Sequence, residues 1–156
     1  IKLSAFNLKI KFKEKEYFLE SLFQGSKIFS DQGPNKDIYE KSSIDAKKDK
    51  RIKRSDLKAF NFFGETFSLD FDFYSWLYFI ALNQNEKLKV EILNYEAFTD
   101  IEFNPEKSLN CQAYSAALYS SMVKNKILVN DKEYDIGELK NLMPSKKIKN
   151  YQQKLI

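Results

Sequence analysis

The chain has 156 residues, of which 43% are hydrophobic, and this size and apolar content suit one domain with its own core. Its net charge is +4 and its positive charge is almost all lysine, which permits a phosphate-bearing partner without requiring one. The chain has no histidine and one cysteine, which excludes a Ser-His-Asp triad, a structural zinc site and a disulfide framework within it.

The same counts indicate the cellular setting. One thiol is typical of a reducing, cytoplasmic protein, and no apolar run approaches the roughly 20 residues of a membrane span. We therefore expect a cytoplasmic protein with no membrane, metal or cofactor partner. The chain begins at Ile1, without a methionine or a signal peptide, which is consistent with a fragment of a longer protein.

Hydrophobic periodicity predicts the elements of the first half of the chain. Residues 3–12 alternate between apolar and polar side chains, which predicts a half-buried strand. A helix is expected over about 18–30, where apolar side chains cover most of the circumference. The other expected elements of this half are a turn at Gly33-Pro34, a short basic helix that Ser42 caps and that ends near Arg54, and an extended aromatic segment over 60–69.

The second half is predicted to be mainly helical. Residues 70–84 carry large apolar side chains at helical spacing, and Asn85 is a suitable cap for a further helix to about residue 95. The remaining expected elements are an alternating segment over 98–103, a helix from Ser108 or Asn110 to about 124, a hairpin over 127–136 and a short final helix. The predicted fold class is therefore a mainly helical α+β domain.

Three polar side chains in the expected helix over 18–30 form the strongest candidate site. Glu20, Gln24 and Lys27 fall on one narrow stripe at about 3.6 residues per turn, and most of the remaining helix surface is apolar. Such a helix is usually buried, where charged groups are costly unless they are paired or change their pKa. Three interpretations stay open: an exposed pair without a role, a buried structural ion pair, and a lysine nucleophile assisted by a carboxylate.

Weaker candidates lie elsewhere. Asp100 and Glu102 share one face of the segment over 98–103, either as a solvent face or as an acidic pair that lines a pocket and holds ribose hydroxyls. Arg51 and nearby lysines suit phosphate groups, although a solvated charged face is the simpler explanation. Asn110 opens a helix, where backbone N–H groups favour anions, but an ordinary cap explains it more simply.

Taken together, these motifs resemble the NADAR family, also called YbiA-like. Residues 3–7 (Leu-Ser-Ala-Phe-Asn) and 20–29 (Glu-Ser-Leu-Phe-Gln-Gly-Ser-Lys-Ile-Phe) are similar to its Leu-Ser-Asn-Phe and Ser-Glu-His-x-x-Gln-Ala-x-Lys-Phe motifs. Ser21 and Gly25 depart from the usual His and Ala. Residues 98–118 look like the branch that accompanies DarT-type ADP-ribosyltransferase toxins, whose members often carry an additional N-terminal segment.

The resemblance implies both a domain division and an activity. It suggests a YbiA-like domain over residues 1–124, with residues 125–156 as a C-terminal extension packed on it. The implied activity is that of an N-glycosidase, which removes ADP-ribose from guanine bases of DNA as the antitoxin to a DarT-type toxin. ADP-ribosylated DNA and the cognate toxin are the expected partners.

Residue by residue, the resemblance makes Glu20, Lys27 and Glu102 the expected catalytic residues. Lys27 would attack the anomeric carbon and form a Schiff base that water hydrolyses, while Glu20 protonates or orients the leaving base. In a concerted alternative, Glu20 or Glu102 activates water directly. The expected substrate-binding residues are Gln24, Phe23, Asp100, Asn110, Arg51 and Phe63.

Two other functions remain open from the sequence. One is a binding module that neutralises the toxin by direct contact without catalysis. The other is a small-molecule N-glycosidase, like YbiA-like relatives that act on intermediates of the riboflavin pathway.

Overall fold

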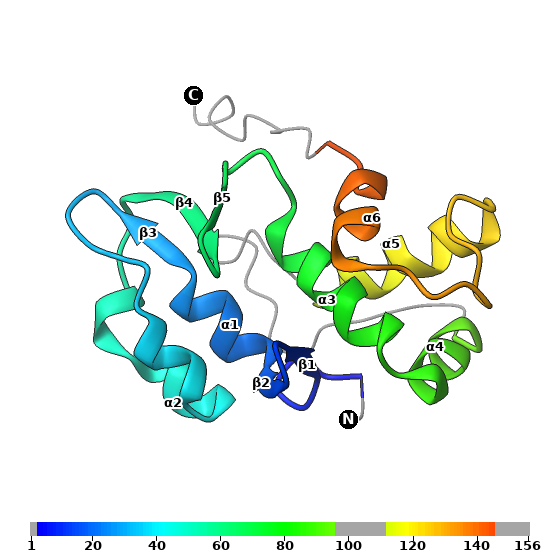
Figure 1. The fold of residues 1–156 in the computed structure, drawn as a ribbon, viewed down its shortest axis with the longest axis horizontal. Coiled ribbons are helices and arrows are strands. Elements are labelled where there is room, and N and C mark those ends of the chain that lie inside the picture. Colours follow the sequence, from blue (N-terminus) through cyan, green and yellow to red (C-terminus); the bar gives the residue numbers. More distant parts are fainter. Residues whose placement is uncertain (1–2, 96–111, 146–156) are drawn as a thin grey trace, which may run out of the picture.

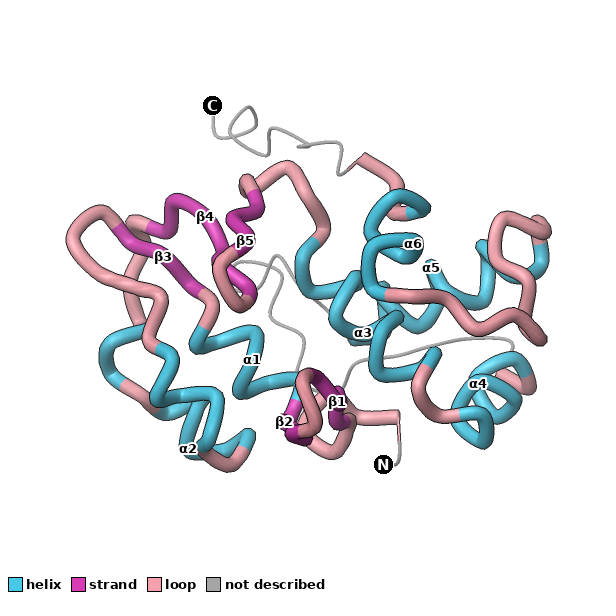
Figure 2. The backbone as a smooth tube through the Cα atoms, in the orientation of Figure 1, coloured by secondary structure: helices cyan, strands magenta, loops and turns pink. Residues whose placement is uncertain are grey.

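A computed structural model of the chain describes residues 3–95 and 112–145, and it has the mainly helical α+β fold that the sequence predicts (Figures 1 and 2). The strands are β1 (Lys9–Phe12), β2 (Lys15–Phe18), β3 (Lys27–Phe29), β4 (Leu57–Phe62) and β5 (Glu65–Phe67). The α-helices are α1 (Leu19–Gly25), α2 (Ser43–Lys48), α3 (Phe73–Asn83), α4 (Glu86–Leu93), α5 (Gln112–Lys124) and α6 (Ile136–Leu142). Two 3-10 turns, η1 (Lys36–Glu40) and η2 (Lys50–Ile52), flank α2. Within the described ranges, every helix is too short or too polar to span a bilayer.

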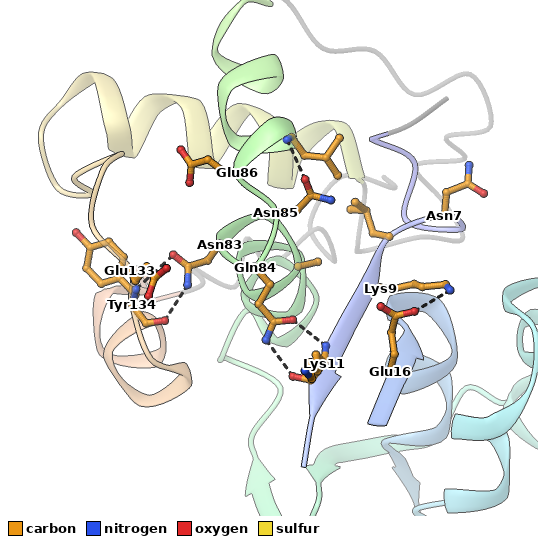
Figure 3. Close-up of a pocket in the computed structure, with 13 residues that line it drawn as sticks. Asn7, Lys9, Lys11, Glu16, Asn83, Gln84, Asn85, Glu86, Glu133 and Tyr134 are labelled. Atoms are coloured by element: carbon orange, nitrogen blue, oxygen red, sulfur yellow. Dashed lines mark hydrogen bonds and ion pairs between the residues drawn. The ribbon is translucent and has the colours of Figure 1, made fainter. Parts of the chain in front are cut away.

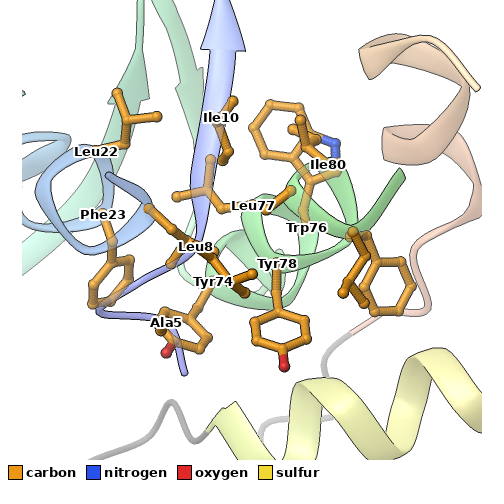
Figure 4. Close-up of a cluster of buried hydrophobic side chains, with 14 of the residues drawn as sticks. Ala5, Leu8, Ile10, Leu22, Phe23, Tyr74, Trp76, Leu77, Tyr78 and Ile80 are labelled. Carbon is orange, nitrogen blue, oxygen red and sulfur yellow. The ribbon is translucent and has the colours of Figure 1, made fainter. Parts of the chain in front are cut away.

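Helix α3 lies at the centre of the molecule, with α1 and the β3–β5 strands on one side and α5 and α6 on the other (Figure 1). Ten consecutive residues of α3, 73–82, are buried, which is the pattern of a helix packed on nearly every side. Figure 4 shows Leu8 and Ile10 from the N-terminal segment and Leu22 from α1 gathered against Leu77 of α3. The core therefore fixes α1 against a helix that is itself buried along nearly its whole length.

Two small antiparallel sheets organise the N-terminal half. β1 pairs with β2, and the second sheet has the order β3-β4-β5. The free edge of β1 is bound by the side chain of Gln84. Its Oε1 accepts from the Lys11 N–H at 2.7 Å and its Nε2 donates to the Lys11 carbonyl at 3.0 Å (Figure 3). The end of α3 thereby satisfies backbone groups that a two-stranded sheet would leave unpaired.

The predicted helix over 18–30 is wrong in its second half. α1 ends at Gly25, Ser26 caps it, and Lys27 is the first residue of β3. The Ser26 carbonyl accepts from the Asn61 N–H at 2.7 Å, so pairing with β4 begins where the helix stops. The apolar residues after Lys27 include a β-branched and an aromatic side chain, which fit a strand as well as a buried helix. Tertiary pairing therefore overrides the helical spacing.

Two other predictions need correction. The strand predicted over 3–12 forms only in its last four residues, β1, because the preceding segment turns and the Ser4 carbonyl accepts two backbone hydrogen bonds. The hairpin predicted over 127–136 has no strand in the part of the chain that the structure describes. This segment instead packs on α3, where Asn83 Nδ2 donates to the Tyr134 carbonyl at 2.8 Å.

Gly25 occupies a position where the resembled family usually has alanine, and the structure explains the difference. A Cβ added to Gly25 would lie 2.6 Å from Cδ1 of Tyr39. Tyr39 is buried, and its hydroxyl group donates to the Asn61 carbonyl at 3.0 Å and shares a hydrogen bond with Ser26 Oγ at 3.1 Å. The ring cannot move aside without losing these bonds.

A Gly25→Ala variant is therefore expected to lower the free energy of unfolding by about 1–3 kcal/mol, the usual cost of overpacking a core. Urea denaturation of the wild type and the variant measures this difference. In a Tyr39→Leu background the added methyl group has more room, so the cost of Gly25→Ala should shrink. Equal costs in both backgrounds would show that contact with Tyr39 is not the cause.

Candidate functional site

Helix α1 carries the two polar side chains at the centre of the candidate site. All seven of its residues are buried, because its apolar side chains join the core and Ser21 Oγ donates to the Lys41 carbonyl at 2.8 Å. Ser21 is fully buried, so the larger imidazole of the family's usual histidine would not fit in its place without a rearrangement. Glu20 and Gln24 lie one turn apart on this rigid helix.

Glu20 is a buried carboxyl group that accepts a hydrogen bond from one neighbouring side chain. Its side chain is 5% exposed, and Gln24 Nε2 donates to its Oε1 at 2.7 Å. Burial raises the pKa of Glu20, and the hydrogen bond from Gln24 and the charges of Lys47 and Lys27 offset only part of this effect. The group therefore holds its proton to a higher pH than an exposed glutamate, as a general acid requires.

Lys27 reaches the same region from β3 and not from the helix. It pairs with Phe60 of β4 and is half-buried, and its Nζ lies 5.0 Å from the centroid of the Phe23 ring. Burial lowers the pKa of Lys27 from 10.5 to about 8, against the opposing effect of the Glu20 charge. The lowered pKa makes the amine of Lys27 available in its neutral, nucleophilic form near pH 8.

One acceptor in this region has no partner. Gln24 is 6% exposed, and its Oε1 makes no hydrogen bond within the described residues because its Nε2 is directed at Glu20. A buried acceptor left unpaired costs about 1–3 kcal/mol. A hydroxyl group of a bound sugar would satisfy it.

The other predicted site residues have structural contacts of their own. The Phe23 ring packs in the core, 5.4 Å from Phe60 and 5.0 Å from Tyr74, and offers one face to the ammonium group of Lys27. Phe63 lies in the turn between β4 and β5 and stacks on Phe12 with centroids 4.3 Å apart. Both rings are therefore held in place by neighbouring aromatic side chains.

The guanidinium group of Arg51 is held by acidic side chains. Its Nη2 lies 2.6 Å from Asp37 Oδ2 and 2.8 Å from Asp49 Oδ2, and its Nε donates to Asp49 Oδ1 at 3.0 Å. These contacts connect η2 to η1 and to the end of α2. The three remaining predicted residues, Asp100, Glu102 and Asn110, lie outside the described residues.

Two residues beside this site belong to motifs that the sequence analysis recognised, but the sequence did not place them next to Glu20. The positive charge of Lys47, in α2, lowers the pKa of Glu20. The Nζ of Lys47 lies 4.7 Å from the centroid of the Phe6 ring. Phe6 belongs to the Leu-Ser-Ala-Phe-Asn motif, and Lys47 belongs to the Asp-Ala-Lys-Lys run at 45–48. The motifs therefore contain both residues, but the sequence alone does not show that the two motifs lie close together in space.

A surface hollow lies away from these residues, between the β1–β2 hairpin, the junction of α3 and α4, and residues 133–134 (Figure 3). Glu20, Gln24 and Lys27 do not line it. Several polar side chains around it have structural partners: Lys9 pairs with Glu16 at 2.8 Å and Gln84 binds β1. Among the described residues, no group of three acidic or cysteine side chains could hold a metal ion. The buried residues of α1 and β3 remain the stronger candidate.

Comparisons with known proteins identify the family. No curated protein matches the chain. A family model described as "DarT1-associated NADAR antitoxin" matches residues 1–153, which include both described ranges and extend past residue 124. The chain therefore belongs to the family of NADAR antitoxins associated with DarT1.

Proposed function

We propose that this protein is an N-glycosidase that removes ADP-ribose from guanine bases of DNA and so acts as the antitoxin to a DarT-type toxin. The observation that supports this most is the proximity of a buried acid on α1 and an amine of lowered pKa on β3. An acid that keeps its proton and an amine that loses its own are suited to general acid and nucleophile. The family supports the antitoxin role and an association with the toxin.

In the proposed reaction, the neutral Nζ of Lys27 attacks the anomeric carbon of the ribose while the bond from this carbon to the guanine nitrogen breaks. The electron pair of the broken bond stays with guanine, which takes a proton from Glu20. The Glu20 carboxylate then accepts a proton from Nζ and passes it to the ring oxygen. The bond from the anomeric carbon to the ring oxygen breaks as the nitrogen lone pair forms the double bond, which leaves a protonated imine between Lys27 and the opened sugar. Water adds to the imine, which releases ADP-ribose and restores the amine.

The contacts described above support some of the proposed substrate-binding roles more than others. Gln24 uses its unpaired Oε1 to accept a hydrogen bond from a ribose hydroxyl group. Phe63 is the better ring to stack on a base, because Phe23 is buried beside Lys27. A phosphate would have to compete with Asp37 and Asp49 for Arg51. Asp100 and Asn110 are assigned to the sugar side of the site, and Glu102 to activation of water in the direct alternative, on the family motif alone.

Mass spectrometry of a guanine-ADP-ribosylated oligonucleotide tests this function. After incubation with the protein, the oligonucleotide is expected to lose one ADP-ribose and regain an intact guanine. An unmodified oligonucleotide is the control and should not change. Retention of the ADP-ribose, together with protection of cells from the toxin, would favour a non-catalytic binding module. Cleavage of the N-glycosidic bond in a free nucleotide but not in the oligonucleotide would favour a small-molecule glycosidase.

A further inference from the structure

The N-terminal segment and α2 together position the ammonium group of Lys47. Ser43 Oγ donates to the Phe6 carbonyl at 2.8 Å, which ties the segment to the start of α2. One turn further along α2, Lys47 Nζ lies 4.7 Å from the centroid of the Phe6 ring. An aromatic face attracts an ammonium group without neutralising it, so the contact orients Lys47 and preserves its charge.

Lys47 differs in this respect from two other cations near α2. Lys41 pairs with Asp49 at 2.7 Å, and Arg51 binds both Asp37 and Asp49. Lys47 is exposed, and none of the ion pairs within residues 3–95 and 112–145 includes it. Its charge is therefore available to an external anion.

Helix α2, which carries Lys47, packs against α1, which carries Glu20. The charge of Lys47 lowers the pKa of Glu20 by more than the charge of Lys27 does, although burial still dominates. The exposed ammonium group of Lys47 therefore lies near the buried acid. An anion bound there would lie next to a group held at Glu20.

We propose that Lys47, oriented by Phe6, binds the pyrophosphate of the ADP-ribose group. This rests on the proposed function, in which Glu20 and Lys27 act at the anomeric carbon. The pyrophosphate is separated from that carbon by one ribose, so an anion beside the acid fits the covalent structure of the substrate. Phe6 is a positioning residue in this account, and Lys47 makes the contact.

Isothermal titration calorimetry with free ADP-ribose tests the proposal without any turnover. A Lys47→Gln variant is expected to bind about 10- to 100-fold more weakly than the wild type, the usual effect of losing a charge-assisted hydrogen bond. Lys48→Gln is the matched control, because Lys48 is the next residue of α2 and is also exposed. It should bind like the wild type. Equal weakening of both variants, or of neither, would overturn the proposal.

Two further arms separate the alternatives. Phe6→Leu should weaken binding of ADP-ribose about two- to fivefold in the wild-type background and have no further effect in the Lys47→Gln background. If Phe6→Leu weakens binding equally in both backgrounds, Phe6 does not act by positioning Lys47.

Unmodified oligonucleotide should bind Lys47→Gln and the wild type equally. If Lys47→Gln weakens only the oligonucleotide, Lys47 contacts strand phosphates instead. Because these arms measure binding alone, absent glycosidase activity would refute the proposed function without deciding this one.

Discussion

A Lys27→Met variant is expected to lose release of ADP-ribose by at least about 10³-fold, because the nucleophilic amine is gone. Borohydride treatment during turnover should trap a covalent adduct on the wild type and none on the variant. Lys58→Met is the matched control, since Lys58 is an exposed lysine on the neighbouring strand β4. It should keep full activity. An active Lys27→Met, or a wild type without an adduct, would contradict the Schiff-base route.

The same variant should be more stable than the wild type. Below pH 8, Lys27 is protonated in both the folded and the unfolded chain, so the folded state bears the whole cost of burying the charge. Methionine removes this cost and can keep contact with Phe23, so the free energy of unfolding at pH 7 should rise by about 1–3 kcal/mol. The difference should shrink between pH 8 and 10.5, where the folded lysine is already neutral. A variant that is inactive because it is misfolded would instead be less stable.

A Glu20→Gln variant is expected to lower kcat about 10²- to 10⁴-fold, because the amide group of glutamine cannot deliver a proton to the leaving base. It should also shift the pH dependence. Ionised Glu20 raises the pKa of Lys27, so its replacement by glutamine lowers that pKa, and the residual rate of the variant should rise at a pH below 8. The variant should also lack the fall in rate that ionisation of the acid causes in the wild type. Initial rates measured from pH 6 to pH 10 give both quantities.

Glu40→Gln is the control for this change, because Glu40 is exposed on η1 and pairs only with Lys15 among the described residues. Its rate and its pH profile should match those of the wild type. If Glu20→Gln slows the reaction but leaves the pH profile in place, the acid and the amine are not coupled electrostatically. If it does not slow the reaction, Glu20 is not the general acid.

Local signals in the sequence predicted the elements that local interactions determine. The Asn85 side chain accepts from the Leu88 N–H at 3.2 Å and the Ser42 side chain accepts from the Asp45 N–H at 3.2 Å, as expected of helix caps. The apolar run of α3 was also identified. The end of α1 was not, because the strand that pairs with Lys27 lies about thirty residues further along the chain and leaves no local signal.

For the candidate site, the sequence predicted the neighbours on one helix but not those that tertiary structure brings in. Glu20 and Gln24 are one turn apart on α1 whatever the rest of the chain does. Lys27 reaches them for a different reason from the predicted stripe, because the chain turns at Ser26 and enters β3. The contact between Phe6 and Lys47 joins segments far apart in the sequence, so no periodicity could indicate it.

The close approach of Tyr39 to Gly25 bears on how this protein diverged from its relatives. In this fold, alanine at the position of Gly25 needs a smaller or displaced side chain at that of Tyr39. We therefore expect relatives with alanine at the first position to differ at the second as well. Transplanting the α1 motif between family members therefore requires the η1 segment to travel with it.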